Sequence, residues 1–145
     1  MATHVLVPLD GSPPSWAAFD HAVSMFDGEQ ITVLHVVDPT EGVYAGVDGG
    51  YYDPGMYDRA VEAGEELCEQ AIERAEESSA ASSTVFETAI ETGRPARTIL
   101  DFADERDVDH IVIGSHGRSG VTRVLLGSVA ESVTRRASVP VTVVR

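Results

Sequence analysis

The sequence predicts an α/β fold: an open, twisted, mostly parallel five-stranded sheet with helices on both faces. Five short aliphatic runs are distributed along the chain, and segments with helical apolar spacing separate them. This alternation is typical of parallel strands that are buried between two helical layers. With 145 residues, of which 43% are hydrophobic, the chain supports one domain with its own core, residues 1–145, and leaves no room for a second.

The first predicted helix lies between the first two predicted strands in the sequence. Val5 to Leu9 is a short aliphatic run, and Pro13, directly after Ser12, occupies the first position of a helix. Ile31 to Val37 has the composition of a buried strand. The helix is expected to run to about Gly28, because its large apolar residues recur at helical spacing: Trp16, Phe19, Val23 and Phe26.

A long loop is predicted over residues 38–56, which are rich in glycine and tyrosine and show neither helical nor strand periodicity. Such loops tend to be lids, interfaces or disordered segments. We expect it either to close over a ligand, to cover a neighbouring subunit, or to lie on the surface. The helix that follows, about 57–79, has one apolar stripe opposite a glutamate face that we expect to be solvated. Cys68 falls on the stripe, and a single cysteine excludes an internal disulfide.

The second half of the chain continues the alternation of strands and helices. A Gly-Arg-Pro turn at 93–95 follows the third strand, and the third helix ends near Arg106. The remaining predicted elements are a third strand from Thr84 to Glu91, a fourth strand from Ile111 to Ile113, a fourth helix from Ser128 to Ala137 and a last strand from Val141 to Val144.

A glycine signature, Gly114-x2-Gly117-x9-Gly127-Ser128, lies between the fourth strand and the fourth helix. Glycines let main-chain N–H groups approach phosphate oxygens and allow positive φ, and a helix start adds unpaired donors and a positive dipole end. The segment therefore predicts a phosphate-binding loop. Alternatively, the glycines shape an ordinary strand-to-helix turn, and Ser128 caps the helix and reaches Glu131 as a capping box.

The charge distribution favours the anion site. From Gly114 to Arg145 the chain has five arginines and one glutamate, a net charge of +4, whereas the first 113 residues carry −18. Because most of the surface would repel an anionic ligand, the arginine-rich segment is the natural place for one. Arg118, inside the glycine segment, is the candidate phosphate ligand. Arg123 also lies inside the glycine segment. The arginines outside it, Arg135, Arg136 and Arg145, are expected to solvate the surface or pair with acidic helices.

The overall composition excludes several classes of protein. All ten basic residues are arginine, the net charge is −14 and the isoelectric point is about 4.5, which resembles adaptation to the high-salt cytoplasm of an extreme halophile. This acidity argues against nucleic-acid binding. No apolar run approaches the roughly 20 residues of a membrane span, and no leader is visible, so we expect a soluble, cytoplasmic protein. The five histidines show no metal-ligand spacing, so we expect no metal site of the protein's own.

Polar residues follow the first and fourth strands, where ligands bind in open α/β sheets. Asp10 could hold ribose hydroxyls or a divalent ion carried by a triphosphate; alternatively, it forms an Asx-turn at the strand-to-helix corner. His116 is the one histidine with an expected role in binding, and Ser12 is expected to cap a helix. The last strand, Val141 to Val144, has little sequence after it to cover its edge, and pairing with a second copy would remove that exposed edge.

Three stretches together resemble the universal stress protein family: the glycine signature, the opening His4-Val-Leu-Val-Pro8-Leu-Asp10-Gly-Ser12, and the segment Leu125-Leu-Gly-Ser-Val-Ala-Glu-Ser-Val with Pro140-Val-Thr-Val-Val. The resemblance implies a fold of the adenine-nucleotide α-hydrolase type with strand order 3-2-1-4-5, a homodimer and ATP binding. It also implies the binding residues: Pro8, Leu9 and Asp10 at the adenine and ribose, Val36 at the adenine through its main chain, and Gly114, His116, Gly117, Arg118, Gly127, Ser128 and Val129 around ribose and phosphates.

The function that we expect is that of an ATP-binding stress-response regulator with an unidentified protein partner, the ATP carrying Mg²⁺ or Mn²⁺ on its phosphates. Efficient catalysis is not expected, because phosphoryl transfer needs a cationic clamp, a held metal and a positioned nucleophile, and the chain has no lysine and no paired carboxylates at the loop. Slow hydrolysis or self-phosphorylation, with Ser128 or Ser119 as acceptor, stays open. The alternatives are a nucleotide-free interaction dimer and a nucleotide-transferring enzyme, which would need a glycine-serine loop where this chain has Asp10-Gly-Ser-Pro-Pro14.

Overall fold

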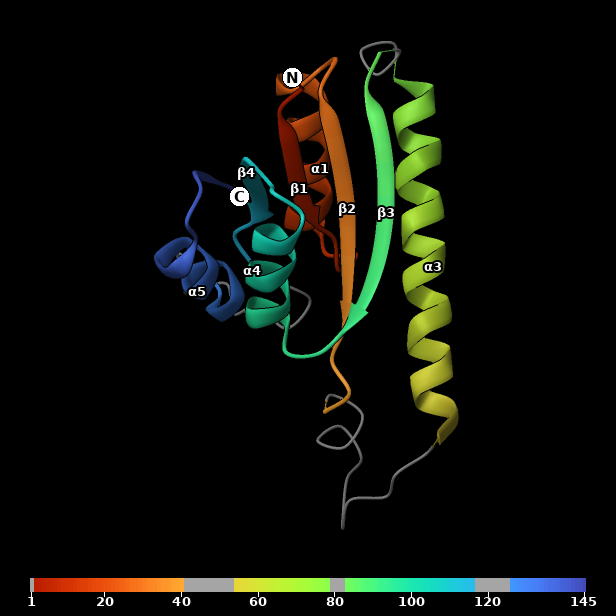
Figure 1. Cartoon of the computed structure of the whole chain (residues 1–145). Coiled ribbons are helices and arrows are strands. Elements are labelled where there is room, and N and C mark those ends of the chain that lie inside the picture. The colour runs from red at the N-terminus through yellow and green to blue at the C-terminus, as the bar shows by residue number, and fades with distance from the viewer. Residues whose placement is uncertain (1, 41–53, 79–82, 117–125) are drawn as a thin grey trace.

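The computed structural model describes residues 2–40, 54–78, 83–116 and 126–145. No helix within these ranges is long and apolar enough to cross a membrane. Strands and helices alternate along the described chain (Figure 1) as β1 (His4–Pro8), α1 (Pro13–Met25), β2 (Gln30–Val37), α3 (Pro54–Glu77), β3 (Val85–Thr92), α4 (Pro95–Glu105), β4 (His110–Gly114), α5 (Ser128–Arg136) and β5 (Val141–Val144).

The five strands form one sheet in the order β3-β2-β1-β4-β5, and all neighbouring strands are parallel. The most extensive pairing joins β2 to β3, from Gln30 opposite Val85 to Val37 opposite Thr92. Both the parallel sheet and its predicted strand order are thus confirmed. Strand order reverses between β1 and β4, so the chain leaves these two neighbours in different directions at their carboxyl ends.

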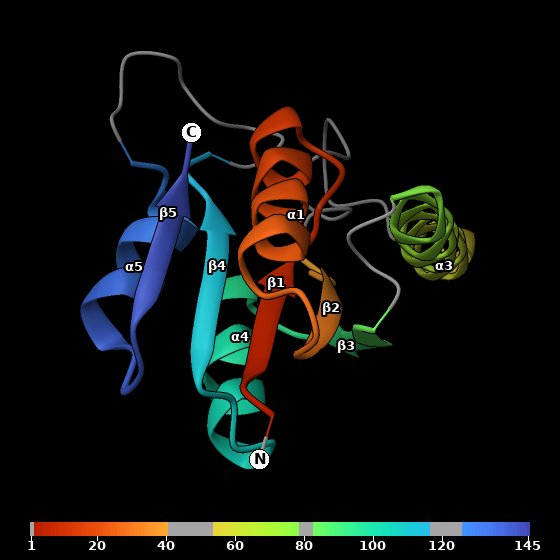
Figure 2. The same ribbon diagram turned by 90° about the horizontal axis from the view of Figure 1, so that it is seen from above.

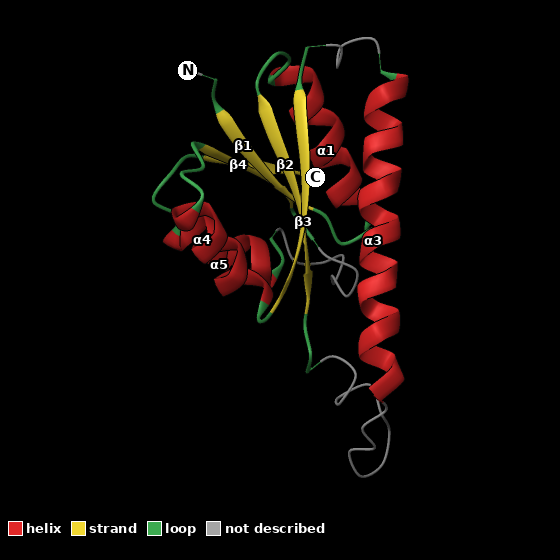
Figure 3. Ribbon diagram, turned by 45° about the vertical axis from the view of Figure 1, so that its right-hand side comes forward, coloured by secondary structure: helices red, strands yellow, loops and turns green. Residues whose placement is uncertain are grey.

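Helices cover both faces of the sheet, as predicted: α1 and α3 lie on one side, and α4 and α5 on the other (Figures 2 and 3). The alternation along β1 shows how the strands serve both layers. Val5 and Val7 pack with residues of α1 and α3, whereas Leu6 packs with residues of α4 and α5, and all three are fully buried. Burial of side chains of this size stabilises the fold by about 1.5–3 kcal/mol each.

Two helix boundaries differ from the prediction. α1 ends at Met25 rather than near Gly28, and Gly28, at φ +85°, turns the chain beyond the helix. α3 begins at Pro54, inside the segment predicted to be a loop, because proline has a helical φ and its missing N–H is unneeded in the first turn. Residues 41–53 of that predicted loop lie outside the described residues.

In the described chain, an ion pair joins α1 and α3, the two helices on the same face of the sheet. The Arg74 guanidinium donates to both carboxylate oxygens of Asp20, at 2.6 and 2.5 Å, and lies 5.4 Å from the centre of the Trp16 ring. About half of each charged side chain is exposed, so the pair contributes at most about 1 kcal/mol. Its geometry is bidentate, with two parallel N–H to oxygen bonds.

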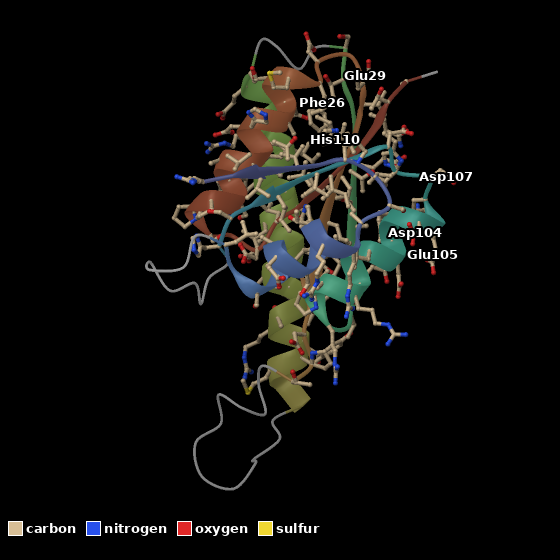
Figure 4. All side chains as sticks on the ribbon, turned by 90° about the vertical axis from the view of Figure 1, so that its left-hand side faces the viewer. Phe26, Glu29, Asp104, Glu105, Asp107 and His110 are labelled. Atoms are coloured by element: carbon tan, nitrogen blue, oxygen red, sulfur yellow. The ribbon has the colours of Figure 1, made fainter. Side chains whose placement is uncertain are left out.

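His110 begins β4 at the amino edge of the sheet, where Figure 4 shows it near Phe26. The His110 Nε2 and Thr142 Oγ are 2.7 Å apart, and the His110 and Phe26 ring centres are 5.0 Å apart. Burial of the imidazole, and secondly the charge of His21, lower the pKa of His110 below its usual value of 6.5. The folded protein therefore binds a proton at His110 less readily than the unfolded chain does.

This difference in pKa predicts a loss of stability on acidification. The contribution of neutral His110 is fully present above pH 6.5 and is lost as the pH falls from there through the lowered pKa of the folded state. Urea unfolding between pH 7.5 and 5.5 should show a falling free energy of unfolding, and His110→Asn should make the fall smaller. His21→Asn is a second test and should also make the fall smaller, because it removes the like charge that is the second cause of the lowered pKa of His110. Identical pH profiles for wild type and His110→Asn would contradict the prediction.

Candidate functional site

The turn after β1 begins at the point where strand order reverses. The Asp10 carboxylate accepts a hydrogen bond from the Ser12 N–H at 2.9 Å, which confirms the Asx-turn foreseen as one alternative for Asp10. Ser12 caps α1, because its Oγ accepts from the Ser15 N–H at 3.3 Å. Gly11 between them has φ +89°, and a Cβ there would lie 3.2 Å from Leu67 of α3. The turn is therefore closed by its own hydrogen bonds and packed against α3 on one side.

Ser12 also connects this turn to the chain that leaves β4. Its hydroxyl donates to the His116 carbonyl at 3.3 Å. Beside it, Gly114 lies so close to the start of α1 that a Cβ would be 2.6 Å from the Pro14 carbonyl carbon and 2.7 Å from the Ser15 nitrogen. The ends of β1 and β4, which the sequence analysis expects to share a ligand, are thus held together directly.

Main-chain hydrogen bonds fix both ends of the glycine segment. The Ser115 N–H donates to the Val144 carbonyl at 2.7 Å, and the Ser115 carbonyl accepts from the Gly127 N–H at 2.6 Å. The Ser115 hydroxyl and His116 Nδ1 are 3.1 Å apart. Ser115 is buried and was not among the predicted site residues; its position inside the signature was the available signal. The bonds bring residues on either side of 117–125 to one place.

The start of α5, which follows the glycine segment, is not the capping box considered as an alternative. Gly127, not Ser128, is the N-cap of α5. Glycine has no side chain, so the N-cap residue makes no side-chain hydrogen bond to the helix. The capping box between Ser128 and Glu131 is therefore wrong, because Ser128 is already the first helical residue. α1 has a hydroxyl cap and α5 has none at its N-cap position, so the N-terminal end of α5 presents main-chain donors and a positive dipole end. Val129 packs with the core beneath the α5 start.

The two described glycines of the signature, Gly114 and Gly127, do not adopt the positive φ that was predicted for them. Among the described glycines, positive φ occurs at Gly11, Gly28 and Gly93, whereas Gly127 has φ −69° and Gly114 is not one of the glycines with positive φ. The expectation of positive φ is thus wrong at Gly114 and Gly127. For Gly114 the reason for glycine is the close approach of the α1 backbone.

The residues implied for adenine and ribose lie at the ends of β1 and β2. Pro8 and Leu9 are buried, and Leu9 belongs to the core under α1 and α3, so a ligand at this edge would meet their main chain rather than their side chains. Val36 is half-buried in the second to last position of β2. His35, which the sequence analysis gave no role, lies between them: its Nδ1 donates to the Leu9 carbonyl at 2.8 Å. No sequence signal separated this histidine from an ordinary buried one.

The remaining predicted phosphate ligands belong to residues 117–125. Gly117 and Arg118 lie outside the described residues, as does Arg123. The expectation that Arg135 pairs with an acidic residue is confirmed, since its guanidinium lies 3.3 Å from Glu131 on the same helix. Within the described ranges, no three His, Cys, Asp or Glu side chains are grouped as they would be around a metal ion. Among the described residues, the groups at this edge that could bind a ligand are mainly main-chain donors and acceptors.

A comparison of the whole chain with known families matches residues 1–145 to the universal stress protein family. The chain belongs to this family. Among its relatives, universal stress protein MJ0531 of Methanocaldococcus jannaschii is 33% identical over 144 residues, which cover 97% of this chain and 81% of that one. The family resemblance drawn from the glycine signature and the two terminal stretches is therefore confirmed.

Solved structures of universal stress proteins share the fold. The structure of protein MJ0577, also of Methanocaldococcus jannaschii, superposes with a TM-score of 0.82 at 27% identity and covers 99% of this chain and 96% of that one. A universal stress protein solved in complex with cAMP gives a TM-score of 0.73 at 25% identity, with 99% and 97% covered.

Proposed function

We propose that this universal stress protein binds an adenine nucleotide, with ATP as the physiological ligand, across the carboxyl ends of β1 and β4, and that it works as a homodimeric regulatory module rather than as an efficient enzyme. The observation that carries the proposal is the 2.6 Å bond from the Gly127 N–H to the Ser115 carbonyl. It brings the two ends of the glycine signature together beside the uncapped start of α5, an arrangement suited to phosphate. The structural relative solved with cAMP supports the same class of ligand.

Each part of the nucleotide has a candidate partner. The adenine would lie against the main chain of Val36 and Leu9, and the ribose hydroxyls would donate to Asp10. The phosphates would accept from the first-turn N–H groups of α5 at Ser128 and Val129, with Arg118 supplying a guanidinium. Mg²⁺ or Mn²⁺ would arrive with the phosphates of ATP, not on a site of the protein's own.

The proposed dimer uses the edge of the sheet. β5 is a half-buried strand at the end of the sheet order, and in the described chain it pairs with β4 alone. Its outer side therefore has main-chain groups for a second strand, and a two-fold axis beside Val141–Val144 would cover them. The high-salt adaptation suggested by the composition is part of the same proposal, because the acidic surface keeps such a dimer hydrated and soluble.

The first test has two measurements: whether the purified protein carries a nucleotide, and whether added nucleotide raises its melting temperature. The gently purified protein, denatured and examined by mass spectrometry, should release an adenine nucleotide. At a hundred times its dissociation constant, ATP should stabilise the folded protein by about 2.7 kcal/mol and raise Tm by about 10 °C. GTP at equal concentration is the control and should raise Tm less.

The same experiment, together with a turnover assay, separates the proposal from its alternatives. An empty protein whose Tm does not respond to ATP, AMP or cAMP would contradict nucleotide binding and favour a nucleotide-free interaction dimer. Continuous release of phosphate from ATP at many turnovers per minute would contradict the view that the protein is not an efficient enzyme.

A further inference from the structure

The hydrogen-bond ladder between β1 and β2 ends in an unusual way at the proposed adenine edge. β1 pairs with β2 up to Pro8 opposite Leu34, and the Leu9 N–H then donates to the Leu34 carbonyl at 2.9 Å. In a parallel ladder the next bond would run from the Val36 N–H to the Leu9 carbonyl. In the described structure, the donor recorded for that carbonyl is the His35 ring, at 2.8 Å. A side chain thus occupies the place of a main-chain donor.

The His35 ring is held firmly in this position. It is only 4% exposed, and Gly64 of α3 covers it so closely that a Cβ at Gly64 would lie 2.4 Å from the ring Cδ2. A carbonyl oxygen only accepts hydrogen bonds, so the Nδ1 that faces Leu9 must carry the proton. The bond therefore fixes the tautomer, and the backbone of α3 fixes the plane of the ring.

Because the His35 ring bonds the Leu9 carbonyl, the main-chain groups of Val36 lie beyond the last β1–β2 hydrogen bond. Main-chain groups along a strand point alternately to its two neighbours, and the Leu34 carbonyl points to β1, so the groups of Val36, two residues later, point the same way. An N–H and a carbonyl at a strand end complement the donor and acceptor on the base-pairing edge of adenine.

We propose that His35 is a positioning residue for the nucleotide: by bonding the Leu9 carbonyl, it ends the β1–β2 ladder early, keeps the Val36 main chain available to an adenine base, and holds Leu9 and Asp10 in place for the ribose. The inference rests on the proposed nucleotide binding and extends it to a residue that does not touch the ligand. It also gives α3 a role, because Gly64 determines where the ring lies.

The test compares AMP binding by calorimetry in three variants and wild type. His35→Leu, which has no donor, should raise the Kd for AMP about tenfold. His35→Asn, whose amide nitrogen can lie near the position of Nδ1, should keep the Kd within about threefold of wild type. Gly64→Ala, which retains the donor but displaces the ring, should raise the Kd several-fold although alanine is the better helix former. This last variant keeps the test decisive if His35→Leu does not fold.

His110→Leu is the matched control. It also removes a histidine hydrogen bond, the 2.7 Å bond between His110 and Thr142, but at the opposite edge of the sheet. It should lower stability without changing the Kd for AMP. A second measurement needs no ligand: amide exchange at Val36 should be slower in His35→Leu than in wild type, since the freed Leu9 carbonyl can accept from Val36.

The outcomes distinguish this inference from the proposed function. If wild type binds AMP and His35→Leu binds it within twofold, or if His110→Leu loses as much affinity, the role of His35 is overturned. If wild type binds no adenine nucleotide, the proposed function fails first and takes the positioning role with it, while Val36 exchange still decides whether His35 ends the ladder.

Discussion

Replacing Gly114 with alanine should destabilise the protein by about 3 kcal/mol or more, the largest loss of stability that we expect from a single methyl group. The added Cβ would lie 2.6 Å from the Pro14 carbonyl carbon, 2.7 Å from the Ser15 nitrogen and 2.8 Å from the Pro14 oxygen. All three are main-chain atoms at the start of α1, so no side-chain rotation relieves the contact. Either α1 or the end of β4 must move.

Urea unfolding of Gly114→Ala and wild type measures this effect. Gly127→Ala is the matched control, because Gly127 belongs to the same signature and has φ −69°, ψ 164°, which alanine also adopts. It should cost about 1 kcal/mol or less. Equal losses in the two variants would show that the approach of α1 to Gly114 is not the reason for glycine there. Movement of α1 would also break the contact from Ser12 to His116, so Gly114→Ala should weaken nucleotide binding too.

The architecture was predictable because it depends on local patterns. Aliphatic runs such as Ile31 to Val37 and Ile111 to Ile113 can be buried on both faces only in a parallel sheet with two helical layers. The strand order came from the family resemblance, since nothing local in the sequence specifies which strands are neighbours. The start of α3 at Pro54 was missed because a proline after glycines and tyrosines is as typical of a loop as of a first helical turn.

The site was predictable in position but not in its supporting contacts. Asp10 and Gly114 follow strands whose carboxyl ends were expected to meet, and they do meet. The reason for glycine at position 114 is a helix 100 residues earlier in the chain, and the role of His35 depends on Gly64 of α3. Contacts between distant segments leave no periodic signal in a single sequence. Gly117 and Arg118 stay predictions, as they lie outside the described residues.

Replacing Gly127 with valine should weaken ATP binding at least about a hundredfold while the protein stays folded. Valine is compatible with the φ and ψ of Gly127, so the backbone need not change. Its isopropyl group would stand at the start of α5 and keep phosphate oxygens from the first-turn N–H groups. Loss of two hydrogen bonds to a charged group accounts for a change of this size. Ser138→Val, just beyond the other end of α5, is the matched control and should bind ATP as wild type does.

Calorimetric titration of ATP into the wild-type protein and Gly127→Val in molar KCl is the most direct test of nucleotide binding. At this ionic strength the Debye length is about 3 Å, so the heat reports local contacts rather than the repulsion of ATP by a net charge of −14. We predict saturable binding of one nucleotide per chain in wild type and almost none in Gly127→Val. The absence of heat with ATP, AMP and cAMP, or equal affinity in the two proteins, would contradict the account.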